Sequence, residues 1–160
     1  MKAVVVSDGK KGHVNQSLAF AELLECSPQV LEIRPLPGVW EPASRFCSRL
    51  LSPARYPRRW ISWVLRNAFG TVEPVREGDI DSSERPLVIS AGTTTAIPAL
   101  ALARRLGGRT LHILGPTFVP PHLFDVLVLP RHDLQGRIPP NVLALPVALG
   151  PVGGLSLIHI

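Results

Sequence analysis

The sequence predicts a Rossmann-like α/β sandwich, a three-layer fold in which helices cover both faces of a mostly parallel sheet. Short apolar runs recur along the chain, they alternate little between apolar and polar residues, and segments of helical periodicity separate them. Strands of this kind are buried on both faces, which is typical of parallel sheets in α/β proteins. The length of 160 residues suits one domain, which we place at residues 1–150.

The first elements form a strand–helix–strand unit. Residues 3–6 are a β-branched apolar run that predicts a buried strand, and residues 7–12 follow as a turn-rich loop. Apolar side chains at helical spacing predict a helix from His13 to Leu24. Residues 29–33 alternate as a second strand.

The basic segment, residues 40–69, comes next. It holds six arginines and one acidic residue, whereas basic and acidic residues balance in the rest of the chain, so the formal net charge of +5 arises here. Pro53 and Pro57 divide the segment into two short predicted helices. The arginines alternate with aromatic side chains, and the positions that define the predicted membrane patch are Arg45, Arg49, Arg58, Arg59, Trp60 and Trp63.

The second half repeats the strand–helix alternation after a polar connection. Residues 95–106 are rich in alanine and leucine, carry two arginines at their end and stop at a Gly-Gly pair, which predicts a helix with cations at its negative end. Strands are predicted at residues 87–90, 110–114, 125–129 and 142–147. Because ligands of open parallel sheets bind at the carboxyl ends of the strands, the loops there are the candidate sites.

The loop after the first strand fits an anion. Gly9 and Gly12 let the backbone approach a ligand, Lys10 and Lys11 add positive charge, and the following helix presents free N–H groups. The pattern is neither a Walker A loop nor GxGxxG, so it gives no motif support for an ATPase or a nicotinamide enzyme. The alternative is an ordinary strand–helix turn with solvated lysines.

Polar side chains open the helix that follows. His13 could act as a general base or donate a hydrogen bond to a phosphate, and Asn15 and Gln16 lie beside it. The alternative is a group of capping side chains that faces water.

Two later loops complete the predicted site. Ser90, Gly92 and Thr93 could offer backbone N–H groups and hydroxyls to a sugar or phosphate, although simple N-capping by a threonine would also explain them. His132 and Asp133 follow another strand, but adjacent side chains usually point apart and no metal-ligand spacing supports them. We therefore expect no metal and no cofactor.

The basic segment suits the headgroup layer of an anionic membrane or an anionic lipid acceptor. No nucleic-acid-binding motif accompanies it, so we expect no nucleic-acid partner. The alternative is that the aromatic residues pack on the sheet and the arginines are solvated. Two cysteines without CxxC spacing and the lack of a signal peptide favour the cytoplasm, with peripheral binding to the inner face of the cell membrane as a further expectation.

The run Ser7-Asp8-Gly9-Lys10-Lys11-Gly12-His13-Val14-Asn15-Gln16 resembles the opening signature of the mitochondrial fission (elongated-mitochondria) protein family, which has many bacterial members. The segments Val88-Ile89-Ser90-Ala91-Gly92 and Pro130-Arg131-His132-Asp133 agree in order and spacing, and the resemblance covers about residues 3–150. This chain departs from the family pattern at Thr93-Thr94, at Gly115-Pro116 and at Arg131.

The resemblance implies the acceptor-side half of a GT-B-like glycosyltransferase, an enzyme with two Rossmann-like domains and a cleft between them. It implies a nucleotide-sugar donor, a glycolipid or lipid-linked envelope acceptor, and His13 or Asp8 as the base. Gly9, Lys10, Gly12, Asn15 and Gln16 would then bind the ligand with Ser90, Gly92 and Thr93, with His132 and Asp133 at the rim. It also implies a second domain, without which this chain should have no turnover. We expect the tail, residues 151–160, to be a truncated linker or a non-native segment, and residues 155–160 resemble nothing in the family.

Two other functions were weighed. A non-enzymatic membrane adaptor, as the plant members of the family suggest, would need the basic segment but no polar cleft. An epimerase of the short-chain dehydrogenase type is disfavoured, because Trp60 stands four residues after the single tyrosine, Tyr56, where that chemistry needs a lysine.

Overall fold

The computed structural model describes residues 2–34, 38, 42, 85–116, 119–134 and 136–146. The basic segment's patch residues Arg45, Arg49, Arg58, Arg59, Trp60 and Trp63 lie outside these ranges, as do the segment's two predicted helices and the tail. The helices and strands are β1 (Lys2–Ser7), α1 (Lys11–Leu23), β2 (Ser27–Glu32), β3 (Leu87–Ala91), α4 (Thr93–Leu106), β4 (Arg109–Ile113), η1 (Pro121–Leu123), β5 (Val126–Pro130), η2 (Arg131–Asp133) and β6 (Val142–Leu145).

The described strands form one six-stranded sheet in the order β2-β1-β3-β4-β5-β6, and every neighbouring pair is parallel. This arrangement confirms the predicted α/β class. The chain passes from β1 to β2 on one side and resumes with β3 on the other side of β1. The order of the strands therefore reverses between β1 and β3, and the carboxyl ends at such a reversal form the crevice in which ligands of this fold class bind.

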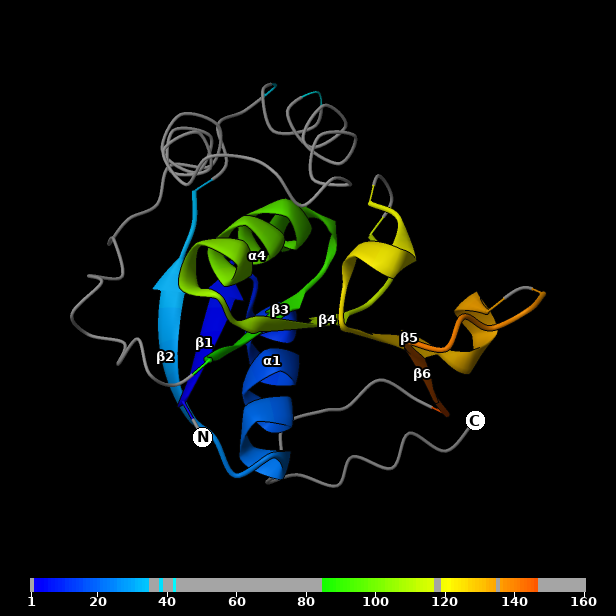
Figure 1. Cartoon of the computed structure of the whole chain (residues 1–160), viewed down its shortest axis with the longest axis horizontal. Coiled ribbons are helices and arrows are strands. Elements are labelled where there is room, and N and C mark those ends of the chain that lie inside the picture. The colour runs from blue at the N-terminus through cyan, green and yellow to red at the C-terminus, as the bar shows by residue number, and fades with distance from the viewer. Residues whose placement is uncertain are drawn as a thin grey trace.

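Alternate side chains of the buried strands enter two cores. Val4, Val6 and Val88 pack with α4, whereas Val5 and Ile89 pack with α1. Figure 1 shows these two helices on opposite sides of the sheet. Because both faces are covered, the strands contain few polar residues and show little alternation.

Glycine sets where two helices begin or end. Helix α4 ends at Gly107, which has a left-handed φ of 66°, and the N–H of Gly108 donates to the Ala103 carbonyl at 2.8 Å. Arg104 and Arg105 occupy the last turn, as predicted. Helix α1 begins at Lys11 and α4 at Thr93, each two residues before the predicted start. The left-handed residues Gly9 and Gly92 turn the chain early enough for the helix to start there.

Candidate functional site

The loop between β1 and α1 folds back across the carboxyl end of β1. Gly9, with a φ of +77°, makes the turn, and its N–H donates to Ser7 Oγ at 3.0 Å. The N–H of Lys10 donates to Asp8 Oδ1 at 3.3 Å. The N-cap residue of helix α1 makes no side-chain cap and its first turn holds no acidic residue, so the positive end of the helix is not offset by residues of the helix itself.

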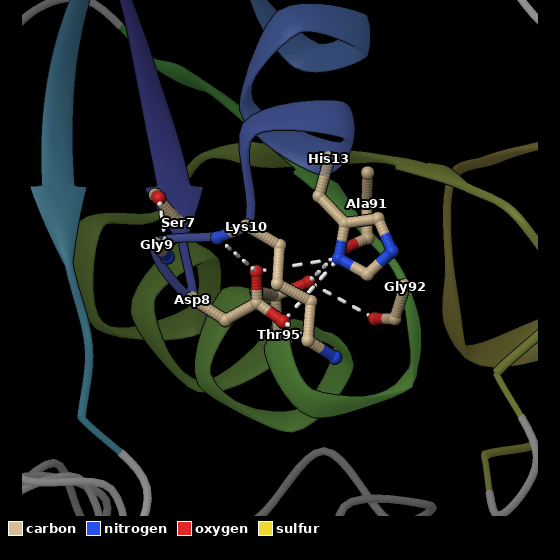
Figure 2. Close-up of polar contacts among 8 residues, drawn as sticks. All are labelled: Ser7, Asp8, Gly9, Lys10, His13, Ala91, Gly92 and Thr95. Carbon is tan, nitrogen blue, oxygen red and sulfur yellow. Dashed lines mark hydrogen bonds and ion pairs between the residues drawn. The ribbon is translucent and has the colours of Figure 1, made fainter.

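Asp8 and His13 form a hydrogen-bonded pair at this loop (Figure 2). His13 Nδ1 donates to Asp8 Oδ1 at 3.2 Å and approaches Oδ2 at 3.3 Å. Because a carboxylate only accepts, the proton lies on Nδ1, and in the neutral ring Nε2 keeps its lone pair. The Asp8 side chain is 3% exposed and that of His13 is 24% exposed, so a buried carboxylate orients a partly open imidazole.

The loop between β3 and α4 meets the same imidazole. Gly92 has a φ of +82°, and a Cβ built on it would lie 2.7 Å from His13 Nδ1 and 2.8 Å from Nε2. Only a residue without a side chain leaves room for the ring. Two loops that the sequence analysis selected separately therefore build one site, as Figure 2 shows.

The N-cap residue of α4 is Gly92, which has no side chain with which to cap the helix. Thr95 Oγ1 instead donates back to the carbonyls of Ala91 at 2.8 Å and Gly92 at 3.0 Å. The hydroxyl of Thr95 therefore binds carbonyl oxygens and does not cap an N–H group at the start of α4. The uncapped N-termini of α1 and α4 flank His13, and both favour negative charge at this point.

Other predicted residues lie at different depths. Ser90 is fully buried, and its Oγ shares a hydrogen bond of 2.7 Å with His112 Nδ1, so its side chain belongs to the interior of the sheet. Asn15 is exposed and Thr93 half-buried. Gln16, one helical turn after His13, has a buried Oε1 without a hydrogen-bond partner among the described residues.

His132 and Asp133 lie in η2, directly after β5, with side chains that are 76% and 47% exposed. His132 Nε2 is 3.5 Å from Asp133 Oδ1, and β4 separates their strand from β3. They belong to the same end of the sheet but not to the Asp8–His13 pair. Within the described ranges, no three histidine, cysteine or acidic side chains are grouped so that they could hold a metal ion.

His112 was missed by the sequence analysis. It is fully buried on β4, and its ring stacks on Phe124 with centroids 4.7 Å apart. Burial, and secondarily the electrostatic effect of the neighbouring His13, lowers the pKa of His112 to about 3, so the His112 ring is neutral at physiological pH. The available signal was a histidine inside an otherwise apolar strand, Thr110-Leu111-His112-Ile113.

None of the helices in the described part of the chain is long and apolar enough to span a membrane. The family model described as mitochondrial fission ELM1 matches residues 11–157. No curated protein and no solved structure matches the chain.

Proposed function

Since the chain belongs to the mitochondrial fission ELM1 family, whose model matches residues 11–157, we propose that it forms the acceptor side of a GT-B-like glycosyltransferase. The donor is a nucleotide-sugar and the acceptor a hydroxyl of a lipid-linked or envelope glycan. The observation that carries this proposal is the buried Asp8 carboxylate, which holds His13 against Gly92 at the strand-order reversal.

His13 is the proposed general base. Its Nε2 takes the proton from the acceptor hydroxyl while the acceptor oxygen bonds to the anomeric carbon of the donor sugar. The bond from that carbon to the diphosphate oxygen breaks, and the nucleoside diphosphate leaves with the electron pair. Asp8 stabilises the imidazolium that forms, because its carboxylate accepts the proton on Nδ1. Asp8 is thus the orienting group, and Nε2 of His13 is the atom that contacts the acceptor.

The diphosphate binds beside this base. The uncapped N-termini of α1 and α4 offer partial positive charge, and Lys10 and Lys11 add two ammonium groups at the first of them. A leaving diphosphate gains negative charge as the bond breaks, and such preorganised charge stabilises it.

The basic segment supports a peripheral position on an anionic membrane, where a lipid-linked acceptor would be reached. The same segment also supports the second candidate, a membrane adaptor without catalysis. The two candidates differ in the site, because an adaptor needs neither Asp8 nor His13.

Turnover of nucleotide-sugars by the full-length protein distinguishes the glycosyltransferase from the membrane adaptor. We expect release of nucleoside diphosphate from at least one of a panel of UDP- and GDP-sugars in the presence of membrane lipid extract. His13→Ala should remove the release, and His122→Ala, which changes an exposed histidine on η1, should not. Vesicle binding without release from any donor would contradict the enzyme and favour the adaptor.

A further inference from the structure

The buried carboxylate of Asp8 contacts two side chains, Lys10 and His13, which differ in their exposure to solvent. Lys10 Nζ lies 3.5 Å from Asp8 Oδ2, and His13 Nδ1 lies 3.2 Å from Asp8 Oδ1. Figure 2 shows all three side chains gathered at the loop. The Lys10 side chain is 65% exposed, against 24% for His13 and 3% for Asp8. Lys10 is therefore the partner that can leave without opening the protein.

The contact between Lys10 and Asp8 is weak in energetic terms. The Asp8 end is buried, but the Lys10 ammonium is largely in water and lies 3.5 Å from Oδ2. Water screens its charge and the lysine side chain loses entropy when it is held, so we expect the contact to change an equilibrium constant by only about fivefold. A diphosphate carries more negative charge than one carboxylate, and an ammonium–phosphate hydrogen bond is charge-assisted on both sides. An incoming diphosphate is thus the stronger partner for the ammonium.

The position of Lys10 brings it to such a ligand. Lys10 is the N-cap residue of α1, so its flexible stem starts beside the backbone N–H groups that would hold the anion. Its side chain caps no N–H of the helix, and Lys11, the next residue, is exposed as well. Only Lys10 of these two has an ion pair with Asp8 among the contacts described.

We propose that Lys10 passes from Asp8 to the diphosphate when the donor binds, so that donor binding leaves Asp8 to His13 alone. This exchange rests on the proposed function, and it couples donor binding to the ability of His13 to take up a proton. Before binding, the ammonium offsets part of the Asp8 charge. After binding, the whole carboxylate charge acts on the imidazole, which favours uptake of the acceptor proton by His13 at the moment when the donor is in place. Lys10 would then determine specificity for a diphosphate over a singly charged anion.

Other charged groups near the loop do not replace Lys10. Glu32 Oε1 lies 3.8 Å from a Cβ built on Gly9, and the same oxygen forms an ion pair with Arg34 Nε at 3.7 Å. His112 is neutral at physiological pH and carries no charge to exchange. Lys11 can attract the anion through space, which makes it the matched control.

The test is a double-mutant cycle with inorganic pyrophosphate as the probe, measured by calorimetry on the full-length protein at one low ionic strength. The variants are Lys10→Met, Asp8→Asn, both together, and Lys11→Met. We expect Lys10→Met to weaken binding about tenfold, as the loss of one charge-assisted contact does, and Lys11→Met to weaken it less. Asp8→Asn should tighten binding about threefold to fivefold when Lys10 is present, because no ion pair has to break, and clearly less when Lys10 is methionine.

The results distinguish a failure of the Lys10 exchange from a failure of the anion site. Equal effects of Lys10→Met and Lys11→Met, with the same gain from Asp8→Asn in both backgrounds, would overturn the exchange and leave the anion site intact. If the unchanged protein does not bind pyrophosphate, both the exchange and the proposed anion site are wrong. A structure with pyrophosphate bound should show the Lys10 ammonium on a phosphate oxygen, and an ammonium still on Asp8 would contradict the proposal.

Discussion

The imidazole of His13 occupies the space where any other residue at position 92 would place its Cβ, and this relationship joins the first and third strands of the sheet at one site. Neither residue could be paired with the other by sequence spacing. The parallel pairing of β1 with β3 brings them together, because it aligns the carboxyl ends of the two strands.

Gly92→Ala should damage both stability and the site. The backbone there has a φ of +82°, which is strained for an L-residue, and the added methyl group overlaps the His13 ring. We expect a loss of about 2–3 kcal/mol in the free energy of unfolding, measured by urea denaturation, together with weaker pyrophosphate binding. Gly12→Ala is the matched control for stability. A Cβ on Gly12 meets nothing within 4 Å, and alanine favours a helix by up to about 1 kcal/mol. Equal stability of the two variants would contradict the close packing of His13 on Gly92.

Asp8→Asn should reduce turnover without abolishing it. An amide can present its nitrogen or its oxygen to His13 Nδ1, so it no longer fixes the proton there or stabilises the imidazolium. We expect the nucleoside diphosphate release rate to fall by roughly 10²–10⁴-fold, with a smaller change in the Michaelis constant for the donor. A change in the Michaelis constant alone would show that Asp8 binds the substrate and does not support the base.

His112 should make the protein less stable as the pH falls. Its pKa is lowered to about 3 in the folded chain, from 6.5 in the unfolded chain, because burial disfavours the charged ring. Both states are neutral above pH 6.5, so the folded state has its full stability there. Below that pH the unfolded chain gains a proton that the folded chain does not bind. Stability should fall by up to about 1.4 kcal/mol per pH unit until the pH approaches about 3.

The comparison with His112→Phe isolates this effect. Phenylalanine keeps the apolar stacking on Phe124 but does not titrate, and it leaves the Ser90 hydroxyl without its partner. The stability difference between the two proteins should therefore shift in favour of the variant between pH 7 and pH 5, measured by urea denaturation. A difference that is the same at both values would show that His112 is not held neutral.

Gly108→Ala should destabilise the fold more than Gly107→Ala. A Cβ on Gly108 would collide with the backbone carbonyl oxygen of Pro86, which also accepts the Arg109 N–H at 3.0 Å. A Cβ on Gly107 meets nothing within 4 Å, and the cost there is the left-handed backbone alone. Thermal unfolding should show losses of about 3 kcal/mol and about 1 kcal/mol respectively. The reverse order would contradict the contact between the Pro86 carbonyl and the start of β4.

Local patterns were enough to predict much of the sheet. The β-branched run at residues 3–6 predicts a strand, and the Gly-Gly pair after residue 106 predicts the end of a helix. Both signals are local, and the structure has β1 at Lys2–Ser7 and the end of α4 at Leu106. The predicted start of the second strand, residue 29, is two residues too late. Strand β2 begins at Ser27 and includes Pro28, which an edge strand tolerates. The loop between β1 and α1 brings Asp8, Lys10 and His13 together, and its role in binding an anion stays a prediction.

Local sequence patterns do not predict contacts between residues that are far apart in the chain. The hydrogen bond between the Ser90 hydroxyl and the His112 ring requires the register of β3 against β4, in which the two residues are direct partners. The position of Ser90 beside the loop favours a ligand role, but the local pattern does not determine which way its side chain points, and the structure buries it against His112. The role of Asp8 as the group that orients His13 likewise depends on how the loop turns at Gly9.

The most direct measurement of the central claim is a ¹H–¹⁵N NMR titration of the full-length protein with inorganic pyrophosphate. We expect saturable shifts in the amides of Gly12, His13 and Thr94, at the two helix N-termini beside the Asp8–His13 pair, and we expect these shifts to be lost in Gly92→Ala. Shifts confined to other parts of the chain, or the same shifts in Gly92→Ala as in the unchanged protein, would contradict it.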